Sequence, residues 1–174
     1  GAPNGRVMEG GFRARLTDKG KRHPVTASLI RGGSGSPAWG RWFRQIEAQA
    51  RRGQVLMNGD GDKPLLILDR VEKGRVAQFL SDHIWLWARG FEGGGPHAEL
   101  LRRLSHWLMK EPDLEEEDLR AKVRGRQMSI ERRTLSEDNP PVTIRAPSGA
   151  EQVVRLKPGA GGRARAEVEA KEKG

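Results

Sequence analysis

The chain has 174 residues, a formal net charge of +9, and 35% hydrophobic and 32% charged residues. These values fit one domain of ordinary size or two small ones, and no apolar run approaches the roughly 20 residues that cross a bilayer. The sequence contains no cysteine, which excludes disulfides, thiolate metal ligands and a cysteine nucleophile within these residues.

Positive charge is concentrated near the N-terminus. Residues 1–52 hold eleven Lys or Arg and three acidic residues, a net charge of +8. The net charge is +1 for residues 53–110 and zero for residues 111–174. A basic stretch over residues 6–52 is compatible with electrostatic binding to nucleic acid or anionic lipid. The cations are interleaved with neutral residues, and no nucleic-acid motif accompanies them, so nucleic acid is not the expected partner.

The first elements are predicted from residue spacing. Alternation over residues 11–16 favours a short strand, and residues 32–37 have the composition of a glycine-rich loop. Apolar residues then recur at helical spacing, which predicts a short helix that begins near Pro37 and ends before Gly53. These residues are Trp39, Trp42, Phe43 and Ile46.

Two pairs of strands follow. Residues 55–57 and 65–68 read as strands joined by a turn at 58–62, where Asn-Gly and Asp-Gly steps supply positive φ angles. A further strand is predicted at 76–80 after the turn at residues 72–74. The acids of the 58–62 turn lack the spacing of a calcium loop, and no metal ligand set is predicted.

An amphipathic helix is predicted from Pro96 to just before Pro112. Its apolar residues recur at intervals of three and four, as expected for a helix that covers a sheet. They are Leu100, Leu101, Leu104, Trp107 and Leu108.

The periodicity changes after Pro112. Short alternating stretches predict strands at residues 119–123, 128–131, 142–145, 152–156 and 164–168, separated by turns rich in Gly and Pro. This pattern is typical of a small antiparallel β domain, and a β-sandwich is expected. We therefore divide the chain into residues 1–112 and residues 113–174, and expect a fragment whose second domain is incomplete.

The region from about residue 39 to residue 119 resembles the end of the glutamine amidotransferase-like domain in large bacterial membrane proteins of unknown function. The resemblance rests on residues 39–44, 74–77, 80–90, 93–96 and 106–112. It implies a fold of the α/β plus β class, in which part of a flavodoxin-like α/β sandwich is followed by a β-sandwich. It also implies a periplasmic or other extracytoplasmic location in an inner-membrane protein, with membrane spans elsewhere in the parent chain.

The resemblance bears on catalysis as well. A working amidotransferase of this class uses a cysteine nucleophile and a His-x-Glu pair, and the strand at 76–80 followed by His83 resembles the position of that histidine. Trp85 stands where the glutamate would be, and no cysteine is present. We assign no catalytic residue and no cofactor. The expected function is a non-catalytic interaction or ligand-sensing module, with other envelope proteins or domains of its own parent chain as partners. The alternative is a hydrolase or amidotransferase whose nucleophile lies outside these residues.

Candidate binding residues cluster after residue 80. Asp82 and His83 follow a strand end, where α/β folds often hold ligands, although Asp82 also suits a cap of the next turn. Arg89, with the backbone of Gly94 and Gly95 near the start of the predicted helix, is a candidate site for a small anionic ligand. If the backbone is extended, Trp85 and Trp87 point the same way, as an aromatic surface or as a wall of the core.

Overall fold

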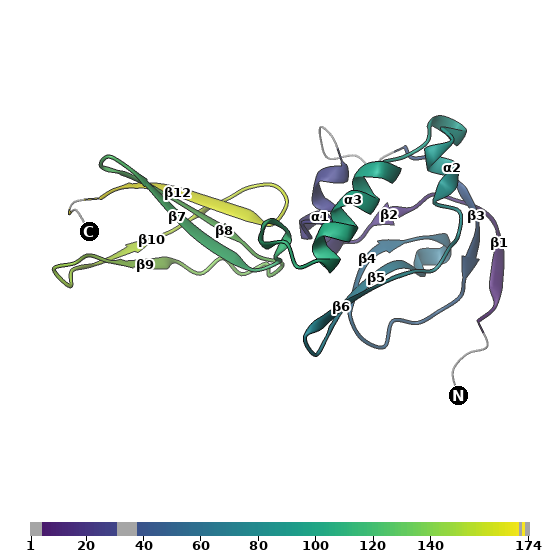
Figure 1. Cartoon of the computed structure of the whole chain (residues 1–174), viewed down its shortest axis with the longest axis horizontal. Coiled ribbons are helices and arrows are strands. Elements are labelled where there is room, and N and C mark those ends of the chain that lie inside the picture. The colour runs from purple at the N-terminus through teal and green to yellow at the C-terminus, as the bar shows by residue number, and fades with distance from the viewer. Residues whose placement is uncertain (1–4, 31–37, 171, 173–174) are drawn as a thin grey trace. The chain divides into compact units, whose positions relative to one another are not determined.

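The computed structural model describes residues 5–30, 38–170 and 172. The chain divides into two compact units, Gly1–Glu115 (unit 1) and Glu116–Gly174 (unit 2), and each is described by itself (Figure 1). The boundary taken from the sequence, after Pro112, lies within the last turn of unit 1. Within the described residues, no helix combines the length and the apolar character that a membrane crossing requires.

Unit 1 contains two antiparallel sheets. Four strands follow the order β2-β4-β5-β6, and β1 pairs with β3 in a second sheet. The two sheets meet where the Ile46 amide donates to the Leu80 carbonyl over 2.7 Å. The strands are β1 Val7–Phe12, β2 Arg15–Leu16, β3 Trp42–Ile46, β4 Gln54–Asn58, β5 Pro64–Val71 and β6 Gly74–Phe79.

In the described part of unit 1, three α-helices and several short 3-10 turns accompany the sheets. The α-helices are α1 Asp18–Arg22, α2 Trp85–Ala88 and α3 His97–Leu108, and the 3-10 turns are Ala27–Leu29, Asp60–Asp62, Phe91–Gly93 and Pro112–Leu114. Helix α3 covers the four-stranded sheet (Figure 1) and buries Leu100, Leu104 and Trp107, as its spacing predicts. Arg75 of β6 donates to the carbonyl of Trp107, so a cation lies at the helix C-terminus, where the helix dipole favours one.

The core of unit 1 is built around three tryptophans. The ring of Trp87 lies 4.7 Å from that of Trp42 and 5.1 Å from that of Trp39, and all three side chains are buried. The fully buried Gln45 joins this core to the loop between β4 and β5, because its amide donates to the Pro64 carbonyl and accepts from the Asp60 amide. A buried amide is tolerated here because its bonds are made.

The helix predicted between Pro37 and Gly53 is wrong, since residues 42–46 form strand β3. The apolar residues are spaced as in a helix, but pairing with β1, which places Trp42 beside Phe12, selects the strand. Ile46 is 43% exposed, whereas a helix with the predicted stripe would have buried it. Tertiary pairing overrides a weak helical pattern in such a short segment.

The fold class agrees with the sequence only in its coarser features. The chain is mixed and sheet-rich, with several antiparallel sheets. A flavodoxin-like core is a parallel sheet with helices on both faces, and every strand pairing in the described part of the chain is antiparallel.

Unit 2 consists of strands and turns. Its sheets have the orders β11-β12-β8-β7 and β10-β9, and Ile130, Leu156 and Ala164 form its small core. The strands are β7 Asp118–Arg124, β8 Gln127–Arg133, β9 Val142–Arg145, β10 Glu151–Val154, β11 Lys157–Pro158 and β12 Arg163–Glu169. All five stretches predicted from alternation contain strands, because period-two alternation of apolar and polar residues is a strong local signal.

Candidate functional site

The segment after β6 is tied to β3 through Ser81. The Ser81 hydroxyl donates to the Arg44 carbonyl over 2.6 Å and accepts from the His83 amide over 3.1 Å. Asp82 forms an ion pair with the guanidinium of Arg44. The two residues predicted at a strand end are therefore held on a rigid turn, and it is Ser81 that caps this turn.

His83 has one nitrogen already occupied. Its Nδ1 accepts the Phe43 amide proton over 3.1 Å, so the neutral ring carries its own proton on Nε2. Nε2 lies 3.8 Å from an Asp82 carboxylate oxygen, which is longer than a hydrogen bond. A general base needs an accessible lone pair, and the only acceptor nitrogen of this ring is bound to the backbone.

Arginines hold the nearby carboxyl groups in their charged form. The Arg44 hydrogen bond lowers the pKa of Asp82, and the Arg41 hydrogen bond lowers the pKa of Glu92. Burial acts to raise the pKa of Glu115, but hydrogen bonds from Arg70 and Arg75 outweigh it and the pKa stays below its usual value.

These shifts predict that acid weakens unit 1. A carboxyl whose pKa is lowered in the folded state stabilises the fold above its ordinary range, and this contribution is lost as pH falls through the folded pKa. We expect the thermal midpoint of unit 1, followed by tryptophan fluorescence, to fall as pH drops below about 4. In Glu115→Gln protein the fall should be shallower, and an unchanged pH profile in this variant would contradict the assignment.

The two tryptophans near His83 have different environments. Residues 85–88 form helix α2, so the extended backbone assumed for Trp85 and Trp87 is wrong, and the two side chains do not share a face. Trp87 is 3% exposed and its indole donates to the Gly40 carbonyl over 2.8 Å. Trp85 is 52% exposed, and its ring lies edge-on to His83 at 6.4 Å.

Gly94 and Gly95 are required by packing around Trp87. A Cβ on Gly95 would lie 2.4 Å from the Trp87 ring. Gly94 has a φ of +69°, donates its amide to the Phe91 carbonyl and accepts the Gly40 amide proton. The backbone amide of Arg89 donates to the Trp85 carbonyl, whereas its exposed side chain forms no hydrogen bond or ion pair with another described residue. At the predicted anion site, the Gly94 amide is therefore already bonded to Phe91. No contact with a described residue holds the Arg89 side chain towards this site.

Two further aromatic side chains are linked to His83 through the backbone of Phe43. The backbone of Phe43 bonds to His83, and its ring lies 5.6 Å from that of Phe91, which is 40% exposed. Arg41 lies over the Phe43 ring and pairs with Glu92. We call Phe43, His83, Trp85 and Phe91, with Arg41 and Arg44, the Trp85 surface. The sequence did not indicate that Phe43 and Phe91 belong to a candidate binding surface, because their contact joins segments far apart in the chain.

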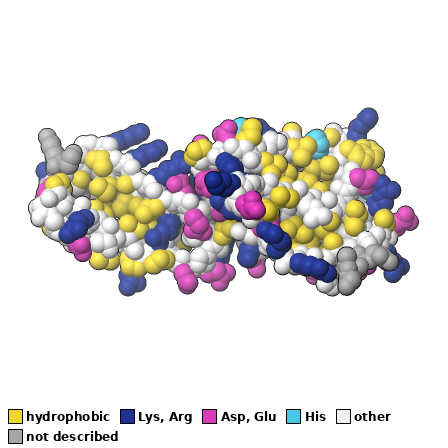
Figure 2. All heavy atoms as spheres, turned by 60° about the horizontal axis from the view of Figure 1, so that its bottom comes forward, with side chains coloured by type: hydrophobic (Ala, Val, Ile, Leu, Met, Phe, Trp, Pro, Cys, Tyr) yellow, Lys and Arg dark blue, Asp and Glu magenta, His cyan; other side chains and the backbone are white. Residues whose placement is uncertain are grey.

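The basic excess of residues 6–52 is partly compensated in the fold. Five of these eleven cations form ion pairs with described acids from the following segment, so part of the uneven charge of the sequence is neutralised locally. The pairs are Arg13 and Arg41 with Glu92, Arg15 with Asp62, Arg44 with Asp82, and Arg52 with Asp69. In one further pair the acid, Glu47, belongs to the N-terminal stretch and the cation, Lys63, to the following segment. Figure 2 shows cationic and acidic side chains interspersed over the face it displays.

Among the described residues, no group of three or more His, Asp or Glu has the arrangement of a metal site. Comparisons with protein-family models, with curated proteins and with solved structures found no match to this chain. The Trp85 surface is therefore interpreted from its own chemistry.

Proposed function

We propose that this chain is a non-catalytic interaction module and that unit 1 contacts a protein partner through the Trp85 surface. The observation that carries the proposal is the half-exposed indole of Trp85, placed on a helix that the buried Trp87 anchors. Tryptophan and arginine dominate the binding energy of protein interfaces, and an indole held on a rigid element loses little entropy on binding. Within the Trp85 surface, Arg41 pairs with Glu92 and Arg44 pairs with Asp82.

The resemblance to amidotransferase-like domains supplies the setting for this proposal. We infer that the chain belongs to the extracytoplasmic part of a bacterial envelope protein, as a degenerate amidotransferase-like domain followed by a β-sandwich. Its partners would be other envelope proteins or domains of the same parent chain. This setting is supported by the position of the Trp85 surface, because its residues lie within residues 39–96, inside the region that carries the resemblance.

The proposal is tested by co-purification of the parent protein from the envelope of its own host. Trp85→Ala should reduce recovery of a specific partner by about tenfold or more, the loss typical of an interface hot spot. Val71→Ala is the matched control, because Val71 is also an exposed apolar residue of unit 1. Equal recovery from both variants would contradict a role for the Trp85 surface.

The alternative is an enzyme whose nucleophile lies outside these residues, and it makes a different prediction. The chain lacks cysteine, and the acceptor nitrogen of His83 is bound to Phe43. Loss of a nucleophile typically costs on the order of a million-fold in rate. We therefore expect ammonia release from glutamine at the rate of the buffer alone, measured with a coupled assay. Activity that disappears in His83→Ala protein would instead support the enzyme.

A further inference from the structure

The two edges of the larger sheet of unit 2 differ. The sheet has the order β11-β12-β8-β7, so β11 and β7 are its edge strands. Strand β11 has only two residues and ends at Pro158, and both properties discourage pairing with another chain. Strand β7 pairs with β8 over its seven residues without a bulge and contains no proline. No strand in the described part of the chain pairs with the other side of β7, so its outward amides and carbonyls are a template for an added strand.

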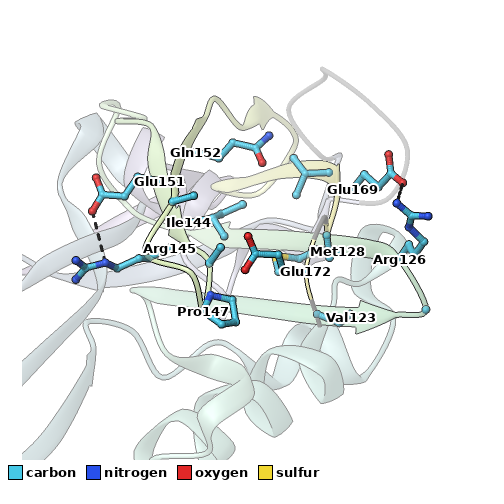
Figure 3. A pocket seen from close by; sticks show the side chains of 15 residues that line it. Val123, Arg126, Met128, Ile144, Arg145, Pro147, Glu151, Gln152, Glu169 and Glu172 are labelled. Carbon is cyan, nitrogen blue, oxygen red and sulfur yellow. Dashed lines mark ion pairs between the residues drawn. The ribbon is translucent and has the colours of Figure 1, made fainter. Parts of the chain in front are cut away.

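One side of β7 is apolar and uncovered. Leu119, Ala121 and Val123 alternate along this side. The register sets Ala121 opposite Ile130, which is 2% exposed, so the apolar side is the one that faces the core of unit 2. Leu119 is nevertheless 54% exposed and Val123 is 56% exposed. Figure 3 shows the Val123 side chain at the wall of the hollow in unit 2. A second strand beside β7 would cover these side chains if it brought apolar residues to the same side.

The charges of β7 make the strand complementary to itself in the antiparallel direction. The strand begins with Asp118 and ends with Arg124. The side chain of Arg124 forms no ion pair with another described residue and is therefore available to a carboxylate of another chain. An antiparallel copy of β7 would present its Asp118 at the end of the strand where Arg124 lies.

We propose that two copies of the chain associate by antiparallel pairing of β7 with β7, about a two-fold axis at Ala121. This register sets Leu119 opposite Val123 of the second copy and Asp118 opposite Arg124 of the second copy. The symmetry repeats each contact, as in any interface that uses the same patch on both subunits. Main-chain bonds join the two larger sheets into one, and the cross-strand pairs of side chains select the register.

The same register brings one pair of like charges together. Arg120 lies opposite Lys122 of the second copy, and like charges directly across two strands oppose pairing. The guanidinium of Arg120 is already neutralised within its own chain, because it lies 2.5 Å from a carboxylate oxygen of Asp118. This neutralisation weakens the unfavourable contact.

Other registers lose the favourable contacts. A shift of two residues in one direction would set Val123 opposite Glu117, and a shift in the other direction would set Leu119 opposite Gly125. A shift of one residue would place the apolar residues of the two strands on opposite faces. Among these registers, only the one centred on Ala121 matches both the apolar side chains and the opposite charges.

The chain contains no cysteine, so single introduced cysteines report the register. Opposite residues of antiparallel strands have Cα atoms about 4.5–5.5 Å apart, within the range that a disulfide spans. Ala121→Cys should therefore give a disulfide-linked dimer of the 174-residue chain under mild oxidation, seen on a non-reducing gel. Leu119→Cys is the matched control, because its counterpart would lie four residues, or about 14 Å, along the strand. It should give little or no linked dimer.

Sedimentation of the cysteine-free chain measures the association itself. We expect a dimer with a Kd on the order of 10⁻⁵ M. Val123→Lys should abolish it, because a lysine on an edge strand opposes pairing, whereas Val153→Lys, at an equally exposed valine of β10, should leave it unchanged. Arg124→Glu should weaken the dimer about tenfold or more, and Arg124→Lys should retain it.

Three results would overturn the proposal. They are equal disulfide yields from Ala121→Cys and Leu119→Cys, a dimer that persists in Val123→Lys protein, and a chain that stays monomeric at about 10⁻⁴ M, ten times the expected Kd. The last result would leave the edge of β7 to a different protein. Trp85→Ala should not alter the dimer, so failure here and failure of the Trp85 surface are distinguishable.

Discussion

Trp87→Ala is expected to destabilise unit 1 by about 3–5 kcal/mol, the usual cost of removing a large buried aromatic side chain. The variant loses ring contacts with Trp39 and Trp42, and it leaves the Gly40 carbonyl without its indole donor. Small domains are stable by only about 5–15 kcal/mol, so much of the population should unfold under mild denaturant.

Tryptophan fluorescence during urea unfolding measures this effect in unit 1 alone, because all five tryptophans of the chain lie there. Trp85→Ala is the matched control. Its side chain is half exposed, and its removal should change the free energy of unfolding by about 0.5 kcal/mol or less. Similar losses in the two variants would show that the indoles have been assigned to the wrong environments.

A similarly large effect is expected from Gly40→Ala. The added Cβ would lie 2.1 Å from the Phe91 carbonyl oxygen, a backbone atom that cannot move aside as a side chain does. The bonds of Gly40 to Gly94 and to the Trp87 indole would be displaced together. We expect a loss of about 3 kcal/mol, at the upper end of the costs of overpacking.

Gly93→Ala separates this clash from backbone strain. Gly93 has a φ of +89°, and a Cβ there meets nothing within 4 Å. This substitution should cost only the left-handed penalty of about 1–2 kcal/mol. Urea unfolding measures the loss of unfolding free energy in both variants. A larger loss in Gly93→Ala than in Gly40→Ala would contradict the close packing of residue 40 against Phe91.

The sequence predicts those elements whose pattern is local and strong. Helix α3 and the strands β7 to β10 and β12 follow from periodicity alone, because their apolar residues recur at regular intervals in the sequence. Strand β3 does not, since its identity depends on pairing with β1, more than thirty residues earlier. The same limit explains why a helical pattern was inferred there from four apolar residues.

The sequence places candidate binding residues after residue 80 but does not show which residues surround them in the fold. His83 and Trp85 are neighbours in sequence and space, whereas Phe43, Arg44 and Phe91 join them only through the fold. The basic N-terminal stretch shows the same limit for charge. Its acid partners Asp62, Asp82 and Glu92 come from later segments, and a count along the sequence cannot pair them.

Photo-crosslinking from position 85 tests most directly the proposal that the Trp85 surface binds a protein. Benzoylphenylalanine in place of Trp85, in the parent protein in its own cells, should give one discrete adduct after irradiation, because a ring half exposed on α2 would lie within the interface. The same substitution at Val71 should give none. An adduct of equal yield from Val71, or no adduct from position 85, would contradict the account.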